Sequence, residues 1–338
     1  MTKLVAATGN DVVKLIPDSS GSWLVETLLS GVGAQCVAVD PRDAQRIYAG
    51  TFDQGLFRSA DGGRTWEPAG AGIPHTRVLS VAVSPSDCTD GIGAVLAGTE
   101  PSSLYRSRNG GDTWEDLPTL RDLPSSPSWS FPPRPWTSHV RWIAPHWENP
   151  DLLYVGIELG GVMRSTDGGE TWEDRKPGSY HDSHAVLTHP MALDRVYEAA
   201  GGGVSLSLDA GASWSEIDDG MDRHYVWGLA VDPADPDLWY VSATYSARYA
   251  HGDRESAEAH VYRRRGSSQW QALAGGMPSP LAVMPYTLLI PVDCPNELYV
   301  GLRDGQIWHS KDQGDSWRRI EINLSSLLAL AALPTSAD

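Results

Sequence analysis

The most regular feature of the chain is a short apolar run that ends at a turn containing Pro or Asp and is followed by a second apolar run. The first run of each pair occupies residues 36–41, 80–85, 142–147, 185–190, 228–233, 288–293 and 327–334. The second run ends near a Gly, as at 46–51 and 152–156. Short apolar segments bounded by turn residues predict β-strands. We therefore predict an all-β chain in which each first run is the innermost strand of a repeated unit.

A polar octet, Ser-x-Asp/Asn-x-Gly-x-Ser/Thr-Trp, interrupts the apolar pattern at regular intervals. It occupies residues 59–66, 107–114, 165–172, 207–214 and 310–317, with partial copies at 18–23 and 266–270. The Asp or Asn can accept hydrogen bonds from backbone N–H groups of a tight turn, and the Gly permits a positive φ. The Trp can bury its ring between neighbouring sheets. We predict a structural role in strand–turn–strand units for Asp61, Asn109, Asp167, Asp209 and Asp312.

The repeats recur about every 40–50 residues, which is the spacing of four-stranded propeller blades. The 338 residues therefore predict one domain, 1–338, folded as a seven-bladed β-propeller with four-stranded blades. The last inner strand has no partners after it, and residues 3–8 look like a second strand with no inner strand before it. We expect the N- and C-terminal strands to share one blade, which closes the ring and removes an open sheet edge.

The octet is identified as the Asp box, or BNR repeat, and the whole chain resembles the Asp-box β-propellers: sialidases, xyloglucanases, sortilin-type receptors and photosystem II assembly factors. In that family the box lies on the turn between the third and fourth strands of a blade, away from the usual ligand face. This sequence lacks the Arg-Ile-Pro motif of sialidases, the second propeller of xyloglucanases and the cysteine-rich modules of sortilins. The resemblance therefore implies the fold, while its members perform unrelated functions.

Two connections are longer than the repeat requires, at residues 116–138 and 244–260. The first is rich in Pro and aromatic residues, which favours an ordered segment that covers the propeller. We expect the second to form a lid. Long connections inside compact domains are usually functional or disordered. In a propeller, both types of connection open on the face opposite the Asp boxes, so we expect that face to bind the ligand.

Polar and aromatic residues gather where four inner strands enter this face. The residues in equivalent register are Arg77, His139, Asp182 and Tyr225, with Leu79, Arg141, His184 and Trp227 one step deeper. The ends of second strands add Glu100, Glu158 and Arg303, and the strand entrances also carry His181 and His224. Because these residues converge around one end of the central channel, we predict a ligand site at this mouth.

Three kinds of chemistry fit these residues. Carboxylates from adjacent blades could form the pair of a glycosidase; the candidates for proton transfer or nucleophilic attack are Glu158, Glu100, His184 and Asp182. Imidazole and carboxylate ligands suit a divalent metal, with His139, His184, His224 or His181, and Glu158 as candidates. Arginines could hold a carboxylate or phosphate by paired N–H donors, namely Arg77, Arg141, Arg223 and Arg303. The ligand-binding candidates are Arg77, His139, Arg141, His181, His224, Tyr225, Trp227 and Arg303.

The net charge of −17 disfavours nucleic acid and anionic membrane surfaces as partners. The first residues include no apolar segment of signal-peptide length, and no stretch reaches the roughly 20 apolar residues of a membrane span. Cys36, Cys88 and Cys294 have no metal-type spacing, and a sparse, odd set of cysteines suits a reducing compartment. We therefore expect a cytoplasmic protein.

We expect the mouth to bind a small polar or anionic ligand such as a carbohydrate derivative, with a hydrolase or lyase as the type of enzyme and a divalent metal as the candidate cofactor. The alternative is a non-catalytic scaffold that docks a protein partner through Trp129, Trp136 and Tyr249. A narrow pocket around His139 would favour a small ligand. A flat mouth rimmed by exposed aromatic side chains would favour a protein partner.

Overall fold

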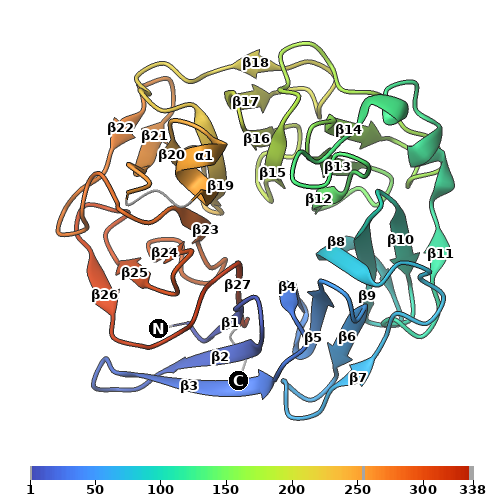
Figure 1. Ribbon diagram of the computed structural model, residues 1–338, viewed down its shortest axis with the longest axis horizontal. Helices are drawn as coiled ribbons and strands as arrows, with labels where there is room; N and C mark the ends of the chain where they lie inside the picture. Colours follow the sequence, from blue (N-terminus) through green and yellow to red (C-terminus); the bar gives the residue numbers. More distant parts are fainter. Residues whose placement is uncertain (1, 253–255, 335–338) are drawn as a thin grey trace.

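The computed structural model describes residues 2–252 and 256–334, so residues 253–255 of the second insertion lie outside the described part. Seven sheets stand around a central channel (Figure 1). This arrangement confirms the predicted all-β, seven-bladed β-propeller. Within the described residues, no helix has the length and apolar character that crossing a membrane requires.

Each blade is an antiparallel sheet that extends outward from the channel. The innermost strands are β4 (Ala34–Asp40), β8 (Arg77–Thr89), β12 (Val140–Pro145), β15 (Ser183–Thr188), β19 (Tyr225–Asp232), β23 (Pro285–Leu289) and β27 (Ala329–Ala332). The second strands are β5 (Asp43–Thr51), β9 (Ile92–Glu100), β13 (Leu153–Ile157), β16 (Val196–Ala200), β20 (Asp235–Thr244), β24 (Leu298–Leu302) and β1 (Leu4–Ala7).

The outer half of each blade completes the sheet. The third strands are β6 (Leu56–Ser59), β10 (Leu104–Ser107), β14 (Gly161–Ser165), β17 (Gly203–Ser207), β21 (His260–Arg265), β25 (Ile307–Ser310) and β2 (Val12–Pro17). The outer strands are β7 (Glu67–Pro68), β11 (Glu115–Asp116), β18 (Ser215–Glu216), β22 (Gln271–Ala272), β26 (Arg318–Ile320) and β3 (Trp23–Leu29). In the blade of β12, a single bridge between Arg164 and Glu173 holds the outer position.

The two ends of the chain close the ring. β27 pairs antiparallel with β1, with Leu4 opposite Ala332 and Ala7 opposite Ala329. The sheet order β27-β1-β2-β3 makes one blade from both termini, as predicted. Apolar side chains of this blade, including Leu4 and Leu15, pack against Tyr299 and Ile307 of the preceding blade. Closure therefore rests both on strand pairing and on apolar burial between neighbouring blades.

Six of the seven inner strands carry a β-bulge at the equivalent position. The pairing skips Gln35, Leu79, Arg141, His184, Trp227 and Tyr286. A bulged residue leaves the pairing ladder, and its side chain is aimed differently from those of its neighbours. On β5, Gly50 lies beside the bulge, where an added Cβ would meet the Val78 carbonyl oxygen of the next blade at 2.4 Å. We call these six residues, with Leu328 directly before β27, the bulge ring.

The Asp boxes all lie on the turn between the third and outer positions of a blade, opposite the entrances of the inner strands. In the box at 165–172, the Asp167 carboxylate accepts hydrogen bonds from the Thr171 N–H (2.9 Å) and hydroxyl (2.6 Å). The Ser165 hydroxyl oxygen accepts from the Gly169 N–H (2.8 Å), and the Trp172 indole N–H donates to the Gly169 carbonyl (3.2 Å). These contacts hold one turn of fixed shape and seat the indole between blades.

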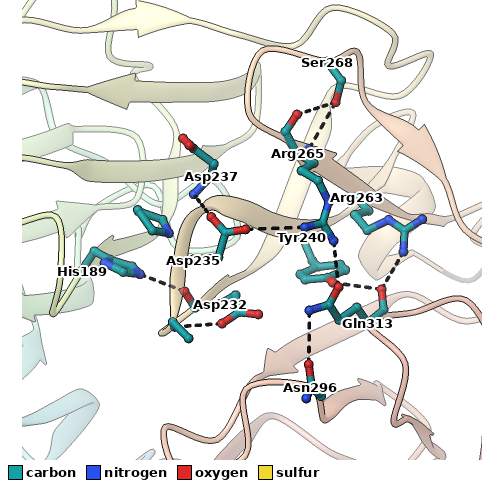
Figure 2. A network of polar contacts seen from close by, with 12 residues as sticks. His189, Asp232, Asp235, Asp237, Tyr240, Arg263, Arg265, Ser268, Asn296 and Gln313 are labelled. Atoms are coloured by element: carbon teal, nitrogen blue, oxygen red, sulfur yellow. Dashed lines mark hydrogen bonds and ion pairs between the residues drawn. The ribbon is translucent and has the colours of Figure 1, made fainter.

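Four of the boxes also join a blade to its neighbour through a basic side chain. A basic side chain on the third strand donates to the carbonyl of the fourth box residue in the next blade; the pairs are Lys14 with Gly62, Arg58 with Gly110, Arg106 with Gly168 and Arg263 with Gln313. Figure 2 shows the last pair. The Tyr240 hydroxyl donates to the same Gln313 carbonyl (2.9 Å), and the Gln313 amide reaches Asn296 (3.3 Å). The boxes thus connect blades on the face away from the mouth.

The two long connections have the places that the sequence suggested. The first leaves β11, forms the 3-10 helices η1 (Pro118–Asp122) and η2 (Ser126–Ser128), and leads into β12. The second joins β20 to β21 and contains α1 (Ala247–His251), which lies beside the channel in Figure 1. Antiparallel order puts both connections at the end of the blades where the inner strands begin.

Candidate functional site

A cavity of about 650 Å³ lies at the mouth of the channel, between the bulge ring and the two insertions. Six of the seven ring residues line it: Gln35, Leu79, Arg141, Trp227, Tyr286 and Leu328. The first insertion contributes its segment 131–134, and the second contributes Ala247, Arg248, His251 and Gly252. The same six ring residues also line a cavity of about 380 Å³ deeper in the channel. The ring therefore forms the boundary between the mouth and the deeper channel.

Glu158 brings a buried carboxylate to the cavity wall, directly after β13. Its Oε2 lies 3.1 Å from His139 Nε2 and 4.0 Å from Arg141 Nε. Burial alone would raise the pKa of this carboxyl, but the His139 contact and the neighbouring His184 and Arg141 side chains outweigh burial and lower the pKa to about 2. Glu158 is therefore an anion at neutral pH and has no proton to donate as a general acid.

His184 and Asp182 lie beside Glu158. The His184 ring is fully buried, with Nδ1 2.6 Å from the Val226 carbonyl oxygen and Nε2 3.4 Å from Asp182 Oδ1. One ligand atom from each of Glu158, Asp182 and His184 lies within 4.8 Å of the other two. The structure thus brings together three of the four residues that the sequence suggested for catalysis.

Aromatic rings form the wall on the side of α1. The Tyr225 hydroxyl lies 3.0 Å from His251 Nε2, and the Tyr286 hydroxyl lies 2.6 Å from His251 Nδ1. Burial is the main cause that lowers the pKa of His251 to about 4, with further contributions from the His184, Arg141 and Arg303 charges. A neutral imidazole donates through one nitrogen and accepts through the other. His251 therefore joins one phenol as a donor and the other as an acceptor, which fixes α1 over the mouth.

Arg141 is the cation of the bulge ring that faces the cavity. Its guanidinium lies over the Trp227 ring, 4.6 Å from the ring centroid, and its side chain is 21% exposed. The 4.0 Å approach to Glu158 is the polar contact found for it among the described residues, and it is too long for a hydrogen bond. The N–H donors of Arg141 are therefore available to a ligand in the cavity.

Glu100 does not line the cavity, although the sequence paired it with Glu158. Its buried carboxylate is held by Arg77 Nη1 and Arg134 Nε, each at 2.7 Å. Burial would raise the pKa of Glu100, but the two guanidinium groups outweigh it and lower the pKa. Arg77 and Arg134 also lie over the Phe52 ring, at 4.6 and 5.3 Å. This ion-pair cluster anchors the first insertion to the propeller, and it holds Arg77, predicted to bind the ligand, outside the cavity lining. The carboxylate that accompanies Glu158 in the cavity is Asp182.

Four further candidates lie outside the cavity lining. His181 is exposed, and His224 is exposed with Nδ1 2.9 Å from an Asp218 carboxylate oxygen. Arg303 donates to the His251 carbonyl (3.0 Å), so it supports α1 from outside. Arg223 donates to the Glu258 carbonyl and to Asp222. Because their donors and rings are directed to these partners or to solvent, we leave all four out of the candidate site.

Sequence reasoning did not single out Phe131, Arg134, His251 and Tyr286 as site residues. Three of them lie in the insertions, whose conformation the repeat does not determine. Tyr286 could have been found, because it precedes an apolar run in the same way as Trp227 does in the previous repeat. The Phe131 ring meets the His139 ring edge to face at 4.8 Å, so the first insertion directly covers the Glu158 cluster.

Comparisons with known proteins agree with the repeat and the fold. The profile of the BNR/Asp-box repeat matches residues 163–174. A GH74 xyloglucanase from Xanthomonas campestris superposes with a TM-score of 0.69 at 17% identity, covering 96% of this chain and 52% of that one. An ancestral GH74 enzyme gives 0.64 at 20% identity, covering 84% of this chain and 38% of its own. The present chain thus spans about half or less of either GH74 chain.

A second kind of neighbour is YCF48 bound to a D1 peptide, with a TM-score of 0.58 at 17% identity and coverage of 86% of this chain and 83% of that one. No curated protein sequence gives a significant match to this chain. Identities this low show a shared fold and carry no activity across. On the evidence of its sheet order and these neighbours, the chain is a seven-bladed β-propeller, and it carries a BNR/Asp-box repeat at residues 163–174.

Proposed function

We propose that the protein binds a small ligand with an anionic group in the mouth cavity. The observation that carries this proposal is Arg141, whose guanidinium faces the cavity over the Trp227 ring with no hydrogen bond to a described residue. A guanidinium with free N–H donors pairs well with a carboxylate or phosphate, because two parallel hydrogen bonds can form. The stacked indole holds the group in place before the ligand arrives.

The shape of the cavity supports a ligand of sugar size. Its volume of about 650 Å³ falls in the range of small-molecule pockets. The aromatic rings of Phe52, Phe131 and Trp227 offer apolar faces to a ring-shaped ligand, while Asp182 and Glu158 offer acceptors for hydroxyl groups. We therefore propose a sugar acid, or another acidic carbohydrate derivative, as the class of ligand.

We further propose that the ligand is a substrate for hydrolysis or elimination. The supporting observation is the convergence of Glu158 and Asp182, which line the cavity, with the buried His184 behind them, since two carboxylates and an imidazole are suited to proton transfer or to metal-assisted attack by water. Because its pKa is lowered to about 2, Glu158 is suited to stabilising positive charge rather than to donating a proton.

Titration calorimetry with glucuronic acid, galacturonic acid and the matching neutral sugars tests the binding proposal. We expect the acidic sugars to bind and the neutral ones to bind at least tenfold more weakly, which is about 1.4 kcal/mol. Arg141→Gln should remove this preference, whereas Arg64→Gln, an exposed substitution in an Asp box, should not change it. Equal binding of acidic and neutral sugars, or a preference that survives Arg141→Gln, would contradict the proposal.

The competing proposal is a scaffold that docks a peptide at the mouth. Exposed aromatic side chains at the rim of the mouth support it. Trp136 and Tyr245, one on each insertion, are 79% and 51% exposed, and the neighbour YCF48 was solved with a peptide bound. Trp129, by contrast, belongs to the first insertion but is buried against the apolar cluster of the β12 blade, so it offers no anchor. Scaffold function predicts that Trp136→Ala abolishes capture of a partner while Arg141→Gln leaves it unchanged.

A further inference from the structure

His184 carries a tautomer that its surroundings fix. Its Nδ1 lies 2.6 Å from the carbonyl oxygen of Val226, which can only accept a hydrogen bond, so Nδ1 carries a proton. In the neutral ring, Nε2 then presents a lone pair. Nε2 has no hydrogen-bond partner among the described residues, and the side chain is fully buried. A buried polar atom without a partner costs free energy, so Nε2 requires either a proton or a metal cation.

Asp182 lies where a second ligand to such a cation belongs. Its Oδ1 is 3.4 Å from His184 Nε2. When the His184 ring is neutral, a carboxylate oxygen therefore faces an imidazole lone pair with no hydrogen atom between them. Two ligands of a tetrahedral zinc ion, each about 2.0–2.1 Å from the metal, lie about 3.3 Å apart. The observed separation therefore matches that of two neighbouring metal ligands.

Glu158 supplies the third ligand and has a supporting contact of its own. One of its carboxylate oxygens falls within 4.8 Å of the ligand atoms of both Asp182 and His184. Its Oε2 lies 3.1 Å from His139 Nε2. Carboxylates that bind metals are themselves commonly hydrogen-bonded, and metal-binding histidines usually donate their other N–H to a carbonyl. His139 and the Val226 carbonyl occupy these two supporting positions.

We propose that Glu158, Asp182 and His184 bind one divalent cation, Zn²⁺ or Mn²⁺, at the wall of the mouth cavity. One imidazole nitrogen and two carboxylate oxygens form a ligand set suited to such ions. Two carboxylates and a neutral imidazole also give the site two negative charges, which Arg141, 4.0 Å from Glu158, offsets in part. The three residues come from two neighbouring blades, so the cation would join β13 to the start of β15.

This inference deepens the proposed function, on which it rests for the identity of the cavity as the binding site. With three protein ligands, a bound cation would have further coordination positions for other ligands. Such a position can hold a water molecule or an oxygen of the ligand, and a cation there polarises that oxygen as a Lewis acid. Arg141 on the neighbouring bulge would then hold the anionic group while the cation holds the reacting oxygen.

Calorimetric titration of chelator-treated full-length protein with Zn²⁺, and separately with Mn²⁺, tests the site. We expect about one equivalent to bind. Asp182→Asn and His184→Gln should each weaken metal binding at least tenfold. His139→Gln should weaken it less, because His139 contacts the Glu158 carboxylate and not the ion. Co²⁺ loading should give a visible absorption band that the His184 variant lacks.

Exposed histidines provide the matched controls, since they bind Zn²⁺ adventitiously. His181→Gln and His224→Gln, both outside the cavity, should leave the stoichiometry and affinity unchanged. If the wild-type protein binds neither ion, or if these control variants lose binding while Asp182→Asn keeps it, the metal site is refuted. Should His184→Gln fail to fold, the partly exposed Asp182 still gives a decisive variant.

The sugar-acid titration separates this inference from the proposed function. If chelator-treated protein binds acidic sugars with the same Arg141 dependence but takes up neither ion, the metal site fails and the ligand proposal stands. If the ion binds as expected but acidic sugars show no preference, the ligand class fails and the metal site stands.

Discussion

At the scale of single residues, the Asp boxes predict a specific response to acid. The Thr65 hydroxyl and N–H donate to Asp61 and lower its pKa to about 2, below the value of about 3.9 in an unfolded chain. A lowered folded-state pKa adds stability that is fully present above about pH 4 and is lost as the pH falls through about 2. We expect Asp61→Asn to weaken the pH dependence of stability in this window, measured by urea midpoints.

One Asp box of this chain already has Asn at the position of Asp61. Asn109 occupies the same box position, accepts from the Thr113 N–H (3.0 Å) and donates to its hydroxyl (2.8 Å), so an amide can hold the turn. Asp61→Asn should therefore stay folded at pH 7. Asp53→Asn, at an exposed position outside the boxes, serves as the control. If the urea midpoint of Asp61→Asn depends on pH as strongly as that of the wild type, the Asp61 carboxylate does not contribute to acid unfolding.

A buried box tryptophan predicts a large loss of stability. Trp172 packs in one apolar cluster with Leu117 and Met163, so its truncation leaves a cavity between blades. We expect Trp172→Ala to lower the free energy of unfolding by about 3–5 kcal/mol. Chemical denaturation of the variant measures this. Trp136→Ala removes a side chain of the same size from an exposed position and should change stability by no more than about 0.5 kcal/mol.

At the scale of elements, the His251 imidazole between Tyr225 and Tyr286 attaches α1 to the inner strands. The pKa of His251 is lowered to about 4 from its usual 6.5, so the folded state disfavours the protonated ring. The contribution of His251 to the attachment of α1 is thus fully present above about pH 6.5 and is lost as the pH falls through about 4. We expect amide protection in α1, corrected for intrinsic exchange rates, to fall across this window while protection in β20 persists.

The matched variant for this helix is His251→Phe, which keeps an aromatic ring but has no group that titrates. It should show a weaker attachment of α1 at neutral pH and no further change on acidification. If wild-type α1 retains full protection at pH 4, the imidazole does not control its attachment.

The strands and boxes could be predicted because each repeat carries its own local signals. An apolar run with a Pro or Asp turn determines β4 and β12 alike, and the Ser-Asp-Gly-Trp chemistry places the turn of 165–172 without knowledge of the rest of the chain. The shared terminal blade followed from counting strands. Position along the inner strands was also predictable in part, since Arg141 and Trp227 were placed in register from the sequence.

The contacts across the mouth could not be predicted in the same way. Glu100 was paired with Glu158 because both end a second strand, but Arg134 of the first insertion takes its carboxylate into an ion pair. His224 was placed with His139 by proximity to a strand entrance, yet its ring contacts Asp218 on the surface. These outcomes depend on how insertions and strand entrances pack in three dimensions, and no local repeat signal specifies that packing.

At the scale of the whole molecule, the shared blade predicts the effect of shortening the chain. Deleting residues 327–338 removes β27, leaving the N–H and C=O groups of β1 unpaired on one side and exposing Leu4 and Ala6. Open apolar edges promote aggregation. We expect the truncated protein to form oligomers or aggregates in light scattering, and a monomer that unfolds cooperatively would contradict the closure role of β27.

The repeated bulge has a consequence for how specificity in this fold can change. The six bulged residues of the ring are skipped in the strand pairing, so their side chains can be exchanged without altering the paired residues that hold the blade. These six positions surround one channel, and each belongs to a different blade. Substitution or recombination of single repeats could therefore rewrite the chemical lining of the channel one side chain at a time. In this chain, Gln35 and Leu79 are the positions at which a library would explore new ligands while Arg141 and the Glu158 cluster are kept.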